Sequence, residues 1–154
     1  MYSKILVALD KSDDARRAAE KVIEIVKNSN SKVVLFHSIE HRISDMLPPI
    51  TIPVGLHSSQ MLVYEDLREA RRIEGKNLLD ETKKIFEREN ISTESRLITS
   101  ESPEDYITRI VDEEGFDLVV LGCKGEHSFA KRVLMGTIPQ IALNRASCDV
   151  LIVR

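Results

Sequence analysis

The sequence predicts an α/β fold in which a five-stranded parallel sheet lies between two layers of helices. Short β-branched runs alternate with stretches of helical periodicity along the 154 residues, which is the pattern of βαβ units. The run at 33–36 is continuously apolar, as expected of a strand that is covered on both faces. No internal repeat or interdomain linker interrupts the pattern, so we assign residues 1–154 to one domain.

The first half of the chain contains two predicted strands, at 5–9 and 33–36. Between them, alanine and aliphatic residues recur at helical spacing, which predicts a helix over about 13–27. Residues 39–60 contain three prolines and a glycine, so we expect no regular helix there. An irregular stretch of this length is usually functional or poorly ordered.

A long helix is predicted next, over about 61–89. The apolar residues predicted to lie on its inner side are Leu67, Ala70, Ile73, Leu78 and Ile85. The charged residues of this helix are interpreted as a solvated outer face with weak ion pairs. A third strand is predicted at 95–98.

The last part of the chain contains two predicted helices and two predicted strands. Ser102 is a favourable N-cap, with Pro103 at the first helical position, and the helix is expected to stop near Gly115. Strands follow at 118–121 and at 150–153, and the last helix begins between them at Thr137. The final strand is expected at the edge of the sheet, where it could pair with another chain.

Composition excludes several classes of protein. The chain has 22 Lys and Arg against 25 Asp and Glu, a net charge of −3, and no basic stripe, so we expect no nucleic-acid partner. No apolar run reaches the roughly 18 residues of a membrane span. The chain opens directly into a strand, so no signal peptide is expected. Its two cysteines, Cys123 and Cys148, fit free thiols in the cytoplasm, and Cys148 is interpreted as a small buried hydrophobe.

Glycines after the fourth strand mark the candidate site. Gly122 and Gly125 follow the strand directly, and Gly136 precedes the last helix. Glycines let a ligand approach the backbone and leave N–H groups open. Thr137 is predicted to cap the helix with Gln140 in a capping box, and the positive end of that helix favours anions. These features suit either a phosphate cradle beyond the carboxyl ends of the strands or an ordinary turn and cap.

The combination resembles the universal stress protein family. Nucleotide-binding members carry Gly, two residues, Gly, nine residues, and then Gly followed by Ser or Thr; here the second spacer has ten residues. The resemblance includes the opening segment 4–10 with Ser12, the strand end at 36–38 and the closing segment 148–153. It implies a Rossmann-like sheet of the adenine nucleotide alpha hydrolase-like type.

The resemblance implies an adenine nucleotide as ligand: ATP, ADP or AMP, with any Mg²⁺ held mainly by the phosphates. The residues that it places around the nucleotide are Ala8, Asp10, Ser38, Leu121, Gly122, Gly125, His127, Ser128, Gly136 and Thr137. Ala8 and the backbone near Ser38 would line the adenine pocket, and Asp10 would lie near the ribose or adenine. His127 and Ser128 could reach phosphate or could belong to a solvated loop.

The family also implies a homodimer that pairs through residues 149–154, and a cytoplasmic, stress-related sensor or regulatory module with an unidentified protein partner. The alternative is a nucleotide-free member that acts as a dimeric scaffold. The longer spacer keeps both open, because an extra residue can bulge out of a loop or can displace the amides beyond hydrogen-bonding reach.

Other functions match the sequence less well. Neither a Walker A string nor a Gly-x-Ser-x-Gly elbow occurs, so we expect no enzyme beyond weak incidental ATP hydrolysis. A phosphoacceptor receiver domain would need an aspartate after the third strand, where this chain has Thr99, Ser100 and Glu101. The histidines and Cys123 lack the clustered spacing of a zinc site, so no metal site is expected.

Overall fold

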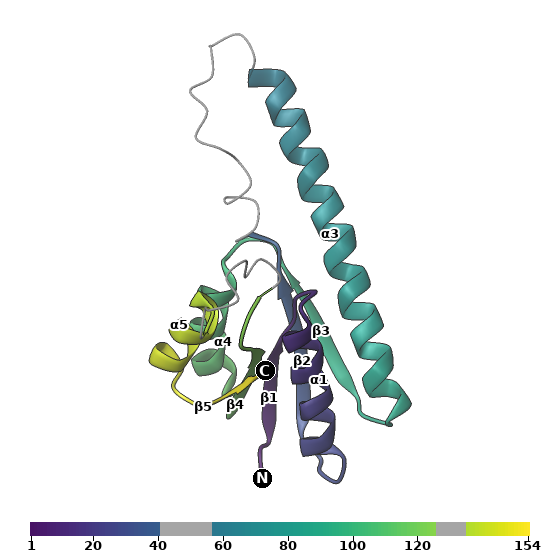
Figure 1. Cartoon of the computed structure of the whole chain (residues 1–154), viewed down its shortest axis with the longest axis vertical. Helices are drawn as coiled ribbons and strands as arrows, with labels where there is room; N and C mark the ends of the chain where they lie inside the picture. The colour runs from purple at the N-terminus through teal and green to yellow at the C-terminus, as the bar shows by residue number, and fades with distance from the viewer. Residues whose placement is uncertain (41–56, 126–134) are drawn as a thin grey trace.

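The computed structural model describes residues 1–40, 57–125 and 135–154. Five parallel strands form one sheet in the order β3-β2-β1-β4-β5 (Figure 1). The bounds of the strands are β1 (Lys4–Ala8), β2 (Lys32–Ser38), β3 (Thr93–Ile98), β4 (Leu118–Gly122) and β5 (Asp149–Val153). The predicted five-stranded parallel sheet is confirmed.

Helices cover both faces of the sheet, as predicted. They are α1 (Asp13–Val26), α3 (His57–Arg88), α4 (Pro103–Glu114) and α5 (Thr137–Arg145). Because successive side chains of a strand point to opposite faces, Ile5 and Val7 of β1 join the core with α1 and α3. Leu6 and Ala8 pack in the core with α4 and α5. Among the described residues, no helix combines the length and apolarity needed to cross a membrane.

The N-caps of α1 and α4 follow directly from the sequence. Ser12 caps α1 by accepting a hydrogen bond from the amide of Ala15 at 3.1 Å. Ser102 caps α4 in the same way, with Pro103 at the first helical position, and Gly115 ends that helix with a left-handed φ of 67°. These are the ends predicted for α4, and both serines satisfy amides that a helix leaves open.

The long helix α3 begins earlier and faces the sheet differently than predicted. It starts at His57, so residues 57–60 are helical. Ala70 is exposed, and Ile73 and Ile85 are 52% and 40% exposed, whereas Leu67 and Leu78 are half-buried. The buried positions instead follow one stripe, Gly75, Leu79, Thr82 and Phe86.

Gly75 gives the physical reason for this register. A Cβ atom at Gly75 would lie 2.6 Å from Leu97 Cδ1 and 2.8 Å from His37 Cδ2. Only a residue without a side chain lets α3 approach β2 and β3 this closely. Figure 1 shows α3 running along β3 and projecting beyond the sheet at its amino-terminal end.

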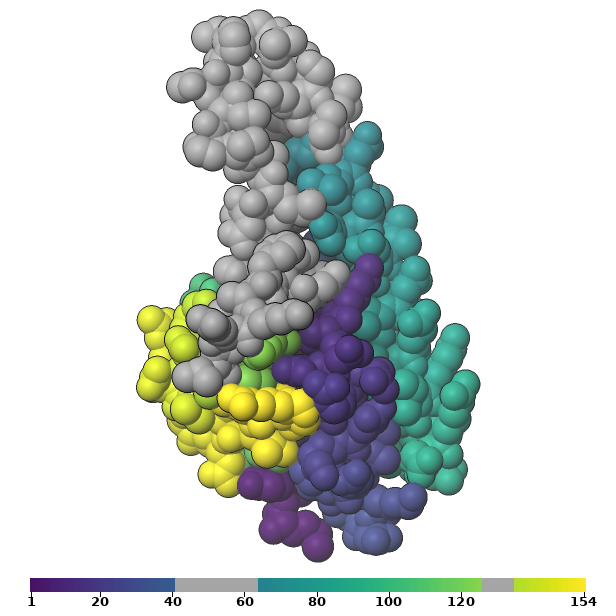
Figure 2. All heavy atoms as spheres, in the orientation of Figure 1, coloured from purple at the N-terminus to yellow at the C-terminus, as the bar shows by residue number. Residues whose placement is uncertain are grey.

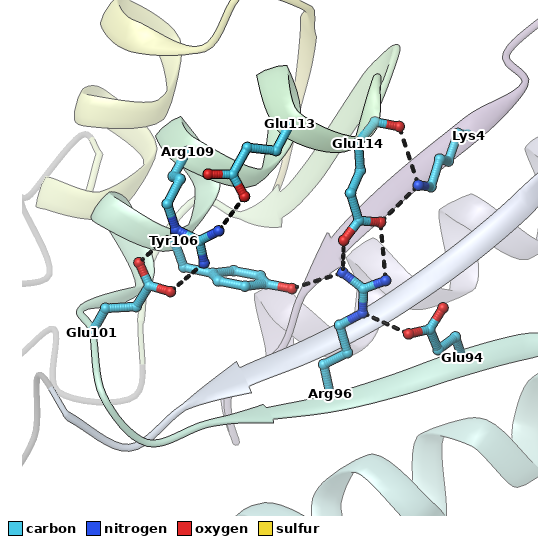
Figure 3. A network of polar contacts seen from close by, with 8 residues as sticks. All are labelled: Lys4, Glu94, Arg96, Glu101, Tyr106, Arg109, Glu113 and Glu114. Atoms are coloured by element: carbon cyan, nitrogen blue, oxygen red, sulfur yellow. Dashed lines mark hydrogen bonds and ion pairs between the residues drawn. The ribbon is translucent and has the colours of Figure 1, made fainter.

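An ion network fastens the end of α4 to two strands (Figure 3). The guanidinium of Arg96 on β3 donates to both carboxylate oxygens of Glu114, at 2.6 and 3.0 Å. Lys4 Nζ on β1 lies 2.7 Å from the same carboxylate and also donates to the Glu114 carbonyl. The hydrogen bonds from Arg96 and Lys4 lower the pKa of Glu114 from its usual 4.5 to about 2.

The strand order sets where a ligand site can lie. The chain runs from β1 outward through β2 to β3, and then returns to the other side of β1 to form β4 and β5. The direction of winding therefore reverses between β1 and β4. In open parallel sheets, ligands bind beyond the carboxyl ends of the strands at such a reversal.

Candidate functional site

The described members of the predicted site meet at this reversal. Ala8 ends β1, Ser38 ends β2, and Leu121 and Gly122 end β4, so four predicted residues share one edge of three neighbouring strands. The hydroxyl of Ser38 donates to the carbonyl of Glu101 at 2.8 Å. The side chain of Ser38 thus joins β2 to the turn before α4, and its main chain forms the strand end.

Asp10 lies in the turn after β1 and braces the start of α1. Its Oδ1 accepts hydrogen bonds from both the amide and the hydroxyl of Ser12. Ser12 is the N-cap itself, so Asp10 orients the capping residue. The second oxygen faces Gly125, because a Cβ atom at Gly125 would lie 3.1 Å from Asp10 Oδ2. Asp10 therefore lies between the turn that follows β1 and the turn that follows β4.

Gly122 has a packing role that the sequence analysis missed. A Cβ atom there would lie 2.7 Å from the amide nitrogen of Ala15 and 2.8 Å from the carbonyl carbon of Asp14. Both atoms belong to the backbone of α1, so the first turn of the helix occupies the space of the missing side chain. This glycine is required by the packing of helix against strand.

Gly125 and Gly136 are neighbours in space although ten residues separate them. The amide of Gly136 donates to the carbonyl of Cys123 at 2.8 Å. A Cβ atom at Gly136 would lie 3.9 Å from the amide nitrogen of Gly125. The two glycines therefore meet at the end of β4, although the spacer between them has ten residues.

The turn that follows β4 is anchored on two further sides. The amide of Cys123 donates to the carbonyl of Val153 at 2.7 Å, which continues the pairing of β4 with β5. The amide of Lys124 donates to Oδ2 of Asp14 at 3.1 Å. Residues 123–125, which we call the glycine turn, are thus fixed by β5 and α1 as well as by Gly136.

The start of α5 corrects the predicted capping box. The N-cap is Gly136, with φ −72° and ψ 165°, and no side chain caps the helix. The bond from Gly136 to Cys123 holds Gly136 extended, and the amide of Gln140 bonds to the Gly136 carbonyl. The helical bonds therefore begin one residue earlier than predicted, so Thr137 is the first helical residue and its side chain is not the cap.

This arrangement leaves two backbone amides in the first turn of α5 without a partner inside the helix. The amide of Gly136 is used by Cys123, and Pro139 in the first turn has none. In the described part of the chain, the amides of Thr137 and Ile138 donate to no backbone carbonyl. Free amides at the positive end of a helix bind anionic oxygens, so this end of α5 can hold a phosphate.

Two predicted site residues are not described by the structure. His127 and Ser128 are outside the described residues. The cysteine prediction was incomplete: Cys148 is half-buried and Cys123 is the fully buried thiol, and the structure shows neither of them in a disulfide. Burial raises the pKa of Cys148, and the nearby Asp149 raises it further.

In the chain segments that the structure describes, no group of three or more His, Cys, Asp or Glu side chains could hold a metal ion.

Comparison with protein families decides the classification. The model of the universal stress protein family matches residues 1–154. The chain belongs to the universal stress protein family. One universal stress protein relative, universal stress protein A homolog 2 of Coxiella burnetii, is 30% identical over 99% of this chain and 95% of its own. Universal stress protein MJ0531 of Methanocaldococcus jannaschii is 27% identical over all of this chain and 83% of its own.

Solved structures of universal stress proteins share the fold. That of MJ0577 from Methanocaldococcus jannaschii superimposes with a TM-score of 0.80 at 25% identity, over 99% of this chain and 96% of its own. Two more distant ones contain nucleotides. The Archaeoglobus fulgidus protein in complex with dAMP has a TM-score of 0.66 at 22% identity, over 99% and 98% of the two chains. An Arabidopsis thaliana protein with AMP bound has a TM-score of 0.63 at 20% identity, over 98% and 90%.

Proposed function

We propose that this universal stress protein binds an adenine nucleotide (ATP, ADP or AMP) at the carboxyl edge of β1, β2 and β4, and that it acts as a sensor or regulatory module. One observation carries the proposal. The bond from Gly136 to Cys123 closes the longer spacer at its base, so the extra residue does not move the glycines apart. The dAMP and AMP complexes of the same fold support the choice of ligand.

The geometry suggests a role for each part of the site. Ala8 and the main chain at Ser38 would line the adenine, and Asp10 would accept hydrogen bonds from the ribose or adenine. Leu121, Gly122 and the glycine turn would border the ribose and phosphates. The amides of Thr137 and Ile138 would donate to phosphate oxygens. Any Mg²⁺ would be carried mainly by the phosphates.

Thermal unfolding with added nucleotide tests the proposal. We expect ATP with Mg²⁺, added to nucleotide-stripped protein at a hundred times its dissociation constant, to stabilise the fold by about 2.7 kcal/mol. In a domain of this size, that raises the melting temperature by roughly 5–10 °C. GTP is the control and should give little shift. No shift with ATP, ADP or AMP would favour the nucleotide-free scaffold instead.

Enlarging Gly136 tests the position of the site. A Cβ atom at Gly136 meets Cys123 O at 3.4 Å and Pro139 Cδ at 3.6 Å, which are ordinary contacts, so we expect Gly136→Val to fold. Its branched side chain would fill the space in front of the Gly125 amide and weaken ATP binding at least tenfold. An unchanged affinity would place the nucleotide elsewhere. Phosphate release from ATP should stay near background in wild type, because we propose binding without turnover.

We also propose that two copies pair through β5. Among the described strands, β5 pairs only with β4, and its residues 150–153 are half-buried. Figure 2 shows the yellow C-terminal end of the chain at the surface. The carbonyl of Val153 accepts a hydrogen bond from the amide of Cys123, so the N–H and C=O of Val153 face β4. Because the N–H and C=O of successive residues point to opposite sides of a strand, those of Ile152 face the open edge of the sheet.

Proline at position 152 should separate such a dimer. Ile152→Pro removes one N–H from the open edge and leaves the bonds of β5 to β4 in place. We expect light scattering of wild type at micromolar concentration to give twice the mass of one chain, and Ile152→Pro to give the mass of one. Ile152→Ala keeps the N–H and should remain dimeric. A monomeric wild type would contradict the proposed pairing.

A further inference from the structure

Asp14 is the side chain that connects α1 to the glycine turn. It is the second residue of α1, and its side chain is 13% exposed, whereas that of the preceding Asp13 is 80% exposed. Its Oδ2 accepts the hydrogen bond from the amide of Lys124 at 3.1 Å, and its Oδ1 pairs with Arg17. The two bonded residues, Asp14 and Lys124, are 110 positions apart in sequence.

The acceptor is rigidly placed. The backbone of Asp14 and Ala15 lies directly against Gly122, so the first turn of α1 keeps a fixed position relative to the end of β4. The Arg17 pair holds the carboxylate from the helix side. The amide of Lys124 therefore meets a preorganised partner rather than a freely rotating side chain.

The bonded amide lies at the centre of the glycine turn. Cys123, on one side of Lys124, is fixed through its own amide and carbonyl. Gly125, on the other side, faces Asp10 and Gly136, and as a glycine it restricts the backbone little by itself. Among the described contacts, the bond to Asp14 is thus the one that orients the backbone of Lys124 between Cys123 and Gly125.

We propose that Asp14 is a positioning residue of the nucleotide site. Through the Lys124 amide it holds the glycine turn in the shape that borders the phosphates, and it does so without touching the ligand. The inference rests on the proposed function and adds to it a residue that acts from α1. The residue recognises no part of the nucleotide, so its effect is on affinity for every adenine nucleotide alike.

Three variants test the inference. Asp14→Ala removes the acceptor, Asp14→Asn keeps an oxygen acceptor without the charge, and Asp13→Ala removes a charge from the same helical turn without a contact to the glycine turn. We expect Asp14→Ala to weaken binding of ATP with Mg²⁺ five- to tenfold, as for loss of one hydrogen bond. Asp14→Asn should stay within about twofold of wild type, and Asp13→Ala should match wild type.

Amide hydrogen exchange gives a readout that stability alone does not move. In nucleotide-free protein, the Lys124 amide should exchange at least tenfold faster in Asp14→Ala than in Asp13→Ala, while the melting temperatures of the two stay close. Equal affinities of these two variants, in a protein that binds ATP, would overturn the role of Asp14. If wild type binds no nucleotide but Lys124 exchange still responds, the proposed function fails and Asp14 remains only an anchor of the turn.

Discussion

Gly122→Ala should lower the free energy of unfolding by about 3 kcal/mol. The added Cβ atom would lie 2.7 to 2.9 Å from the amide of Ala15 and from the carbonyl carbon and Cβ of Asp14. These atoms belong to the backbone and first side-chain carbon of α1, and none of them can rotate away. The helix must therefore shift as a body, which separates its buried side chains Ala18 and Val22 from the sheet. Urea unfolding followed by circular dichroism measures the loss.

Gly136→Ala is the matched control. It adds the same methyl group at the same edge of the sheet, in a backbone of φ −72° that alanine adopts easily, and its contacts are ordinary. We expect its stability to stay within about 1 kcal/mol of wild type. If Gly122→Ala proved as stable as Gly136→Ala, the close packing of α1 on β4 would be wrong.

Glu114→Gln should lower the free energy of unfolding by about 2–3 kcal/mol at pH 7. Arg96 and Lys4 both bind this carboxylate (Figure 3), its side chain is 29% exposed, and together they lower its pKa from 4.5 to about 2. A carboxyl group whose pKa is lower in the folded state stabilises the fold above its unfolded pKa. That stabilisation is lost as the pH falls from about 4.5 towards 2. The difference between wild type and Glu114→Gln should therefore shrink across this range.

Glu113→Gln is the control for this prediction. Glu113 precedes Glu114 on α4, its side chain is 53% exposed, and it pairs with Arg109. We expect Glu113→Gln to lower the free energy of unfolding by less than about 1 kcal/mol, as for surface ion pairs. The dependence of stability on acid pH should stay that of wild type. Asp117 has a lowered pKa as well, because the amides of Ser3 and Lys4 outweigh its burial, so both variants keep some sensitivity to acid. If the free energies of unfolding of wild type and Glu114→Gln differed by the same amount from pH 7 to pH 2.5, the stabilising role given to the ionised Glu114 would be wrong.

The sheet and most helix ends could be predicted because their signals are local. Short strand-like runs, most of them apolar, identified all five strands within one or two residues, and Ser102 with Pro103 identified the start of α4. The family pattern also brought the described site residues to one edge, because the carboxyl ends of β1, β2 and β4 meet there. These features depend on neighbouring residues or on the rules of parallel sheets.

The remaining features depend on contacts between distant segments. The inward face of α3 is set by Gly75, which sequence periodicity does not reveal because glycine carries no apolar side chain. The cap of α5 moved to Gly136 because its amide bonds to Cys123. The contact between Asp14 and Lys124 joins residues far apart in the chain, and an aspartate in the first turn of a helix gives no local sign of it.

The meeting of Gly125 with Gly136 has a consequence for engineering and for divergence within the family. When the two ends of a segment are already held together, lengthening the segment adds little to the entropic cost of closing it as a loop. Each doubling of its length adds only about 0.6 kcal/mol to that cost. Tolerance to insertion should therefore be high between these glycines and low within residues 122–125. A peptide tag or a reporter domain placed in this interval would leave the sheet intact, and relatives should differ in the length of this segment far more than in the turn at its base.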